Sequence, residues 1–419
     1  MNSQKEATVI TLEKEVVEFS PTPAHTPAEK KQGPSEVKKE SKDSARKAAP
    51  RTSKKELGML IKAASEFSKK QLAPDREEND KYPFGPFFDD VLQKAFDVDF
   101  FHILLPENMN GMNQGLSALS VTLDQICQED SSLGGIIFTT AASQELMFAA
   151  GAIAELEKIA TKTTVKDFLI GLPVFNNPSE IRHLAQARKT GDSYSLSGTM
   201  EYMVLGGLAK QALIPASAPG SSRFSYFLVD LEDKGISKSE PILSLGLHAC
   251  PAVDLTLSNV RGTLIGEEEK GAVYFEKMAD RMHVASAAMA TGVMKGSFRE
   301  AFDYSKKRDQ GGQKIINWSE VKMLLSNMAI KISNAEMIVE RACKAADSQE
   351  PRWETRSRAA AIHVQDMACD LTTDGIQILG GVGYMKDFGQ EKRFRDAKHI
   401  QAFLGITPVK KIRFIENMI

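Results

Sequence analysis

Cysteine is scarce in this sequence of 419 residues. Its four cysteines stand far apart and form no CxxC pair: Cys127, Cys250, Cys343 and Cys369. This spacing argues against a zinc site and against a disulfide framework, so we expect reduced thiols that mostly fill the core. The seven histidines form no ligand-spaced pair either, and we expect no metal site.

Long apolar runs and a strong net charge are also missing. No apolar run approaches the roughly 18 residues that a membrane-spanning helix needs, and no basic segment followed by an apolar stretch opens the sequence. The net charge of −2 gives no overall attraction to nucleic acid or to anionic lipid. We therefore expect a cytoplasmic protein whose partners include neither nucleic acid nor a membrane.

Residues 1–52 differ in composition from the rest of the chain. Five prolines interrupt a mixture of Lys, Glu and Ser that holds very few aromatic residues. Such a segment cannot bury enough apolar surface to offset the entropy lost on ordering. We expect a disordered tail, followed by about three structural units, because the chain exceeds the size at which one core keeps growing.

The first ordered unit is expected at residues 53–165. It opens with a capping box, in which Ser53 and Glu56 precede apolar residues at helical spacing. This pattern predicts a helix over residues 54–71, ended by Pro74, and further helical stripes follow. The sequence therefore predicts an N-terminal helical domain.

The hydrophobic period changes twice after this unit. Residues 166–270 show short alternating runs, and Gly191-Asp192 supplies a plausible hairpin turn between two of them. Residues 271–419 return to long helical periodicity, in lengths typical of an antiparallel four-helix bundle. The order is helices, then a β-domain, then helices, which is an α+β chain.

Three strings in the last third could carry chemistry, although no Walker loop, GxGxxG, HExxH or GxSxG motif occurs. In residues 306–314, Arg308 and free backbone N–H groups could grip a pyrophosphate, or the string is a glycine-rich turn with a solvated basic end. In residues 377–384 a helix runs into glycines, which allows close approach of a ligand or simply caps the helix. Residues 393–398, taken alone, suit a surface ion-pair cluster.

Together, in this order, the strings resemble the acyl-CoA dehydrogenases. Residues 377–384, 395–398 and 308–312 match the family's QILGGxGY, RDAK and RxQFG signatures, and the likeness covers about residues 53–419. The resemblance implies an N-terminal helical domain, a middle β-barrel or sandwich and a C-terminal four-helix bundle. It also implies FAD as cofactor, oxidation of the CH–CH group of an acyl-CoA, an electron-transfer flavoprotein as electron acceptor, and a dimer or tetramer of identical or different chains.

The resemblance also assigns residues to the cofactor. In this family the positions that grip the adenosine-diphosphate half of the FAD of a neighbouring subunit correspond here to Arg308, Gln310, Gln377, Gly380 and Gly381. Tyr202, with backbone groups, would hold the flavin ring. These assignments are expectations that depend on the family likeness.

The catalytic base departs from the family pattern. Most members place a Glu in a Tyr-Glu-Gly-Thr run, which here reads Phe403-Leu404-Gly405-Ile406, and leucine cannot accept a proton. Other members place the Glu near the start of the first bundle helix, where Met282 stands at the equivalent position. Asp280 is the nearest carboxylate and would be the base if the helix is shifted.

The flavin-facing loops depart as well. The family's Thr-Glu-Pro and Gly-Ser-Asp stretches correspond to residues 172–174 and 177–179, and its Trp-Ile-Thr corresponds to residues 202–204. Proline has no N–H donor, and Val204 and Ile406 cannot replace threonine hydroxyls. The chain thus keeps the residues that would contact the FAD of a neighbouring subunit and lacks those that would contact its own flavin.

Two hypotheses from different classes follow. The first is an FAD-dependent acyl-CoA dehydrogenase-like enzyme, including a form that needs no base because its substrate carries another leaving group at the β-carbon. The second is a catalytically degenerate subunit that completes the FAD site of an active homologous partner in trans, using Arg308 and Gln377.

Overall fold

The computed structural model describes residues 52–82, 87–175, 177–181, 184–191, 193–416 and 418. Apart from Thr52, the predicted tail lies outside the described residues. All described residues belong to one compact unit, 45–419. Within the described ranges no helix is both long and apolar enough to cross a bilayer. The four cysteines are free and buried, as the sequence predicts.

Helices make up the first part of this unit, as expected. The capping box is present: Ser53 N donates to Glu56 Oε2 at 2.7 Å, and Glu56 N donates to Ser53 Oγ at 3.2 Å. Helix α1 (Lys54–Phe67) continues as a π-helical segment, Ser68–Leu72. The helices that follow are α2 (Arg76–Asn79), α3 (Phe87–Asp97), α4 (Leu116–Cys127), α5 (Ser131–Ala150), α6 (Ile153–Ala160) and α7 (Val165–Phe168).

Helix α5 forms the centre of this part. Its residues from Ser131 to Met147 are all buried. The N-cap Asp130 accepts a hydrogen bond from Ser132 N at 2.7 Å, and Gly151 ends the helix in the left-handed conformation with φ of 70°. A helix that is buried on every side must have elements around it, and here these come from both later parts of the chain.

The middle part is a closed sheet. Its strands are β1 (Ile170–Gly171), β2 (Ala185–Thr190), β3 (Ser193–Val204), β4 (Gln211–Ser217), β5 (Phe224–Asp230), β6 (Ile236–Lys238) and β7 (Ala252–Ile265). Strands β4, β2, β3, β7 and β5 pair in succession, and β5 pairs with β4 to close the ring. The predicted hairpin is present, since Thr190 pairs with Ser193, and Gly191 has a φ of 62°; Asp192 lies outside the described residues.

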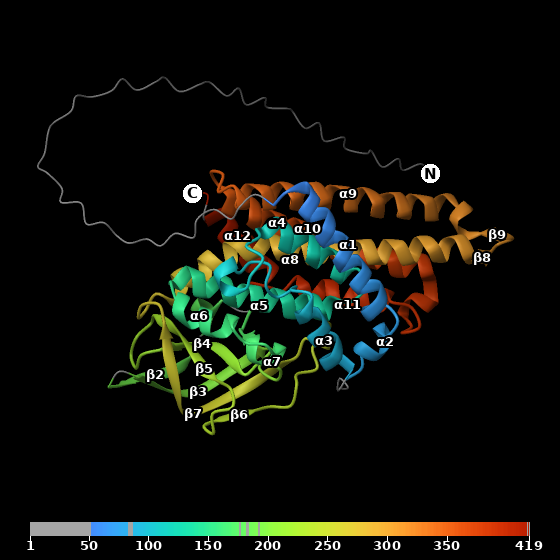
Figure 1. The fold of residues 1–419 in the computed structure, drawn as a ribbon. Coiled ribbons are helices and arrows are strands. Elements are labelled where there is room, and N and C mark those ends of the chain that lie inside the picture. The colour runs from blue at the N-terminus through green and yellow to red at the C-terminus, as the bar shows by residue number, and fades with distance from the viewer. Residues whose placement is uncertain are drawn as a thin grey trace, which may run out of the picture. The chain divides into compact units, whose positions relative to one another are not determined.

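Long helices return in the last part, which confirms the predicted order of helices, sheet and helices. They are α8 (Gly271–Lys307), α9 (Ser319–Asp347), α10 (Trp353–Leu379), α11 (Gln390–Ile400) and α12 (Thr407–Glu416). Figure 1 shows α8 and α9 side by side, running to a short hairpin of β8 (Asp309–Gln310) and β9 (Gln313–Lys314). Helix α8 also packs on α4 and α5, so it joins the two helical parts.

Close packing of α8 on α4 depends on glycine. A Cβ at Gly292 would collide with the carbonyl oxygen of Asp124, and one at Gly296 with that of Gln128. Glycine therefore allows the two helix backbones to approach each other directly. The start of α8 lies beside the closed sheet, where Gly271 packs against Phe224 of β5.

Candidate functional site

Arg308 begins the first candidate cofactor segment. It follows the last residue of α8 with extended backbone, φ −74° and ψ 123°, and the strands β8 and β9 then turn around Gly311 and Gly312, whose φ angles are 64° and 83°. The segment is thus a β-hairpin, which the sequence prediction of a plain turn did not specify. Among the described residues no carboxylate pairs with the guanidinium of Arg308, and both Arg308 and Gln310 are exposed.

The second cofactor segment is the end of α10. Gln377 is exposed, and Gly380 takes a φ of 66° and a ψ of −139° at the start of a 3₁₀ turn, η5 (Gly380–Tyr384). A Cβ at Gly380 or Gly381 would meet no atom within 4 Å, so the space in front of this backbone is open.

The two segments lie at the same end of the bundle. The ring of Tyr304, in the last turn of α8, stands edge-on to that of Phe388 after η5, with the centroids 5.6 Å apart. We call the five predicted cofactor residues of these segments the cradle: Arg308, Gln310, Gln377, Gly380 and Gly381. The cradle presents a cation, amide groups and uncovered backbone to solvent.

Tyr202, the sixth predicted cofactor residue, belongs to a different group. It lies at an irregularity in the pairing of β3 with β7, with a φ of 58°, and its N–H donates to Asp254 Oδ1 at 2.8 Å. Its ring stands edge-on to Phe175 at 5.4 Å. Tyr202 is therefore part of an aromatic group in the segments that the resemblance assigns to the flavin ring.

Phe175 is the centre of this aromatic group. Its ring lies 4.8 Å from Phe403 and 4.7 Å from His399, and Phe403 stacks on Phe138 at 4.8 Å with 12° between the planes. Burial lowers the pKa of His399 to about 4, so its imidazole is neutral at pH 7 and suits an apolar neighbour. Phe175 is not among the residues predicted from the sequence.

Backbone hydrogen bonds join the same segments. Leu404 N donates to Val174 O at 2.8 Å, and Leu172 N donates to Val204 O at 3.1 Å. Leu404 has a φ of 60°, a conformation that bulky side chains rarely adopt. The residue at the family's base position is thus held against the flavin-facing loop.

The cavity beside Leu404 is small. Its volume is about 20 Å³, which suits about one water molecule, whereas ligand pockets measure roughly 300–1,000 Å³. Its lining consists of Phe275, Glu276, Ala279, His283, Arg358, Ile362, Leu404, Lys410 and Arg413.

Glu276 carries the carboxylate in this cavity wall. It accepts hydrogen bonds from Asn177 Nδ2 at 3.0 Å, Arg413 at 3.0 Å and Arg358 at 2.8 Å. Glu276 is not among the residues predicted from the sequence, although its position four residues before Asp280 places both carboxylates on one helix face.

Asp280 itself forms an ion pair with Arg358. Its Oδ1 accepts from Arg358 Nε at 2.5 Å, and the residue does not line the cavity. Burial raises the pKa of Asp280, while Arg358 acts in the opposite direction. Met282, at the family's alternative base position, is fully buried.

Two basic side chains complete the cavity wall. Lys410 Nζ donates to Gln365 Oε1 and Gln401 O, both at 2.8 Å, and burial lowers the pKa of Lys410 to about 8. Burial also lowers the pKa of His283 well below its usual value, and its Nδ1 has no partner among the described residues. The wall thus holds a neutral imidazole beside a carboxylate that is already paired.

The prediction of a surface ion-pair cluster at residues 393–398 is wrong. Arg393 and Asp396 are 3% and 1% exposed. Arg393 pairs with Glu300 at 2.6 Å, and Asp396 pairs with Lys392 at 2.7 Å and accepts from Leu247 N at 2.9 Å. A single string could not show that α11 packs against α8 and α10 and is contacted by the segment at Leu247.

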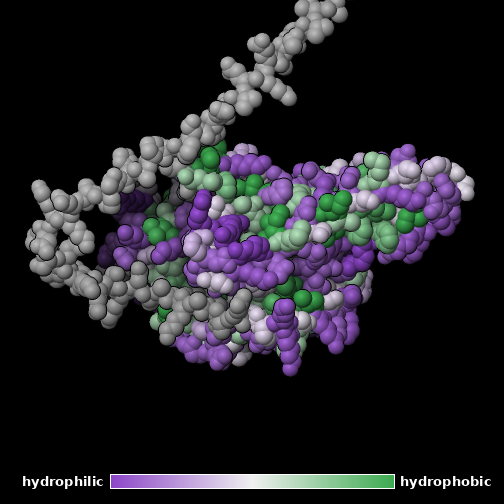
Figure 2. Space-filling view, turned by 90° about the horizontal axis from the view of Figure 1, so that it is seen from above, coloured by the Kyte–Doolittle hydropathy of each residue, from purple (hydrophilic) through white to green (hydrophobic). Residues whose placement is uncertain are grey.

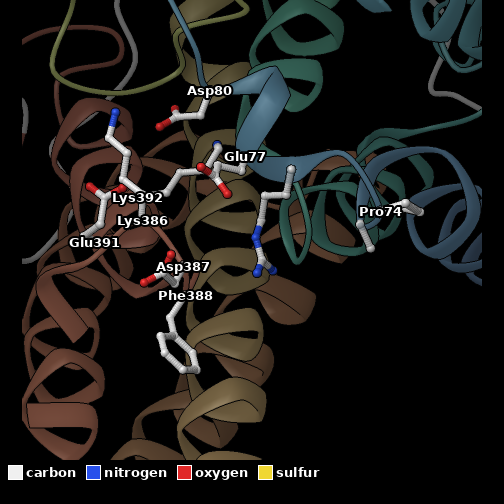
Figure 3. Close-up of a pocket in the computed structure, with 11 residues that line it drawn as sticks. Pro74, Glu77, Asp80, Lys386, Asp387, Phe388, Glu391 and Lys392 are labelled. Carbon is white, nitrogen blue, oxygen red and sulfur yellow. The ribbon is translucent and has the colours of Figure 1, made fainter. Parts of the chain in front are cut away.

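A larger cavity, of about 200 Å³, borders this buried cluster. It lies between α2 and the start of α11, and Figure 3 shows its charged side chains, with Asp80, Lys386 and Lys392 among them. Its lining carries both signs of charge and shares no residue with the cradle or with the aromatic group. We assign it to the packing of the N-terminal helices on α11.

Comparisons with known proteins agree on one fold. Models of the acyl-CoA dehydrogenase N-terminal and C-terminal domains match residues 54–160 and 269–418. Cyclohexane-1-carbonyl-CoA dehydrogenase of Geobacter metallireducens is 26% identical over 85% of this chain and 96% of its own. The caffeyl-CoA reductase-Etf complex subunit CarC of Acetobacterium woodii is 25% identical, over 84% and 96%. The structure of butyryl-CoA dehydrogenase from Megasphaera elsdenii matches with a TM-score of 0.80 at 21% identity, over 86% and 97%.

Proposed function

Because the chain belongs to the acyl-CoA dehydrogenase family, a family of FAD-dependent oxidoreductases, we propose that it works in an enzyme that acts on the CH–CH group of an acyl-CoA. The names of its relatives support this reaction class, since one is a dehydrogenase of a carbonyl-CoA and another is a reductase of an acyl-CoA. Both directions of the reaction exchange a hydride and a proton across the same bond.

The exposed cradle is the observation that carries this proposal. The guanidinium of Arg308 suits a diphosphate, because it can donate two parallel hydrogen bonds to phosphate oxygens. The amides of Gln310 and Gln377 add donors and acceptors, and the uncovered backbone at Gly380 and Gly381 lets a ligand approach closely. These residues fit the adenosine-diphosphate half of FAD.

The segments that the resemblance assigns to the flavin ring leave no room for such a ring. They contact one another through Phe175 and through the Leu404–Val174 hydrogen bond, and the adjoining cavity has a volume of only about 20 Å³. When bound, FAD supplies the hydride acceptor of the reaction, and the residues of this chain that fit it hold and orient its diphosphate.

An electron-transfer flavoprotein is the proposed electron partner. One relative is named as a subunit of a complex with Etf, which supports this choice. The cavity beside Leu404, at about 20 Å³, is too small to hold an acyl chain.

Assembly into an oligomer is part of the proposal. On α9, Met323, Ile330 and Met337 are 67%, 58% and 59% exposed and recur every seven residues, so they form one apolar stripe. Figure 2 views this side of the molecule and shows apolar patches among the polar surface of the helices. Such a stripe suits a helix of another chain of the same fold.

Asp280 stays the predicted base for any turnover at this chain. Asp280→Asn keeps the shape of the side chain but cannot accept the α-proton, so any turnover that this chain carries out itself is expected to be lost. Glu276→Gln is the matched variant on the same helix face. Unchanged turnover in Asp280→Asn would remove Asp280 from the reaction.

FAD retention tests the proposed function. Arg308→Ala removes a charge-assisted contact to phosphate and is expected to lower the FAD content of the native assembly at least tenfold after gel filtration. Arg341→Ala is the control, because Arg341 is an exposed arginine on α9 that pairs with Glu350 and does not belong to the cradle. Equal FAD content in the two variants would refute the assignment of the cradle.

A further inference from the structure

The flavin-facing segments leave no gap for a planar ring. A ring inserted between two segments needs about 7 Å between the facing atoms, because each face makes van der Waals contacts at roughly 3.5 Å. Leu404 N and Val174 O are only 2.8 Å apart. Insertion of the ring between these two segments would break this hydrogen bond.

Aromatic side chains occupy the adjoining space. Phe403 is fully buried, Leu404 is 5% exposed, and Phe175 contacts the rings of Tyr202 and Phe403. Aromatic pairs of this kind stabilise one another beyond the burial of their surface, through the attraction between ring edges and ring faces. The closed arrangement is therefore stabilised by packing and is not an empty pocket with narrow walls.

The cradle, in contrast, opens away from these segments. Its rim carries exposed apolar side chains directly after Gly381, with Val382 at 38%, Tyr384 at 74% and Met385 at 54% exposed. Trp318, which donates from Nε1 to Gln310 O at 3.2 Å, is 40% exposed on the other side. Large apolar side chains around a polar cradle are typical of a surface that another chain covers.

We infer that this chain keeps its flavin-ring site closed with its own side chains, so that an FAD gripped at the cradle leaves its isoalloxazine ring to a different chain of the same fold with an open ring site. This inference rests on the proposed function, because it takes the cradle as the site of the adenosine-diphosphate half. It adds that the catalytic assembly contains two kinds of chain, and that this one contributes binding energy to the partner's cofactor.

Binding of three nucleotides to the full chain tests this inference. We propose titrations of ADP, FAD and FMN, each up to millimolar concentration, with heat release and flavin fluorescence as readouts. FAD and ADP are expected to bind with dissociation constants within threefold of each other, because the ring adds no contact. FMN, which has the ring without adenosine, is expected not to bind, and binding should not quench the fluorescence of FAD.

Two variants and the nucleotide titrations distinguish the assignment of the cradle from the closed ring site. Arg308→Ala should weaken ADP and FAD by the same factor, at least tenfold, and Arg341→Ala should change neither. Binding of FMN, or binding of FAD more than tenfold tighter than ADP with quenched fluorescence, would overturn the closed ring site and leave the proposed function standing. Absence of binding by both ADP and FAD would overturn the cradle, and with it both proposals.

Discussion

Replacement of Lys392 by methionine tests the role of the buried charges around α11. Lys392 is 4% exposed, its Nζ lies 2.7 Å from Asp396 and 3.7 Å from Asp130, and both aspartates are 1% exposed. Burial opposes the charge of this ammonium group, yet the aspartates outweigh burial and raise the pKa of Lys392. Lys392→Met keeps most of the apolar stem and leaves two buried carboxylates without their cation.

The expected loss is about 3–5 kcal/mol in the free energy of unfolding, the usual result of removing one partner from a buried ion pair. Urea denaturation at pH 7 measures it. Lys386→Met is the control, since Lys386 lines the same 200 Å³ cavity as Lys392 but is exposed. Its effect on the free energy of unfolding should stay within about 0.5 kcal/mol.

The pH dependence adds a second check on Lys392→Met. Without the cation, burial raises the carboxylate pKa values in the folded state above those of the unfolded chain. The folded variant then binds more protons, so its stability deficit should shrink as the pH falls from 7 to 5. A deficit below 1 kcal/mol at pH 7, or one that grows on acidification, would refute the reasoning.

Three further outcomes are expected. Asp347→Ala should lower stability by about 1–2 kcal/mol in thermal denaturation, because Asp347 accepts from Leu116 N at 2.6 Å and Ser117 N at 3.0 Å at the start of α4; no loss would contradict this capping role. Between pH 8 and 10.5 the folded chain releases a proton from Lys410 that the unfolded chain keeps, so stability should rise with pH, and Lys410→Met should flatten the rise seen in urea titrations. Ile330→Lys should reduce the molar mass measured by light scattering without unfolding the chain, and an unchanged mass would exclude the α9 stripe from the assembly.

Local patterns allowed much of the fold to be predicted. The capping box at Ser53 and Glu56 depends on residues three apart, and the long helices depend on a period that repeats within each segment. The residues of the cradle were assigned through the family resemblance, because an arginine at a helix break and glycines at a helix end equally suit a plain turn and a helix cap.

Contacts between distant segments could not be predicted in this way. Phe175 is a single aromatic residue in a loop, and only the fold brings it against Phe403, more than two hundred positions later. The burial of Arg393 likewise depends on Glu300 and Gln128, which come from other elements. The helical spacing of Glu276 from Asp280 could have marked it as a candidate site residue. Its arginine partners could not be predicted in this way, because they come from other helices.

The visible spectrum of the chain purified alone tests the central claim most directly. After incubation with FAD and gel filtration, the chain is expected to be colourless, because contacts to the adenosine-diphosphate half alone hold FAD too weakly for it to stay bound through the column. A yellow protein with one FAD per chain and quenched flavin fluorescence would contradict the account, since the ring would then lie within this chain.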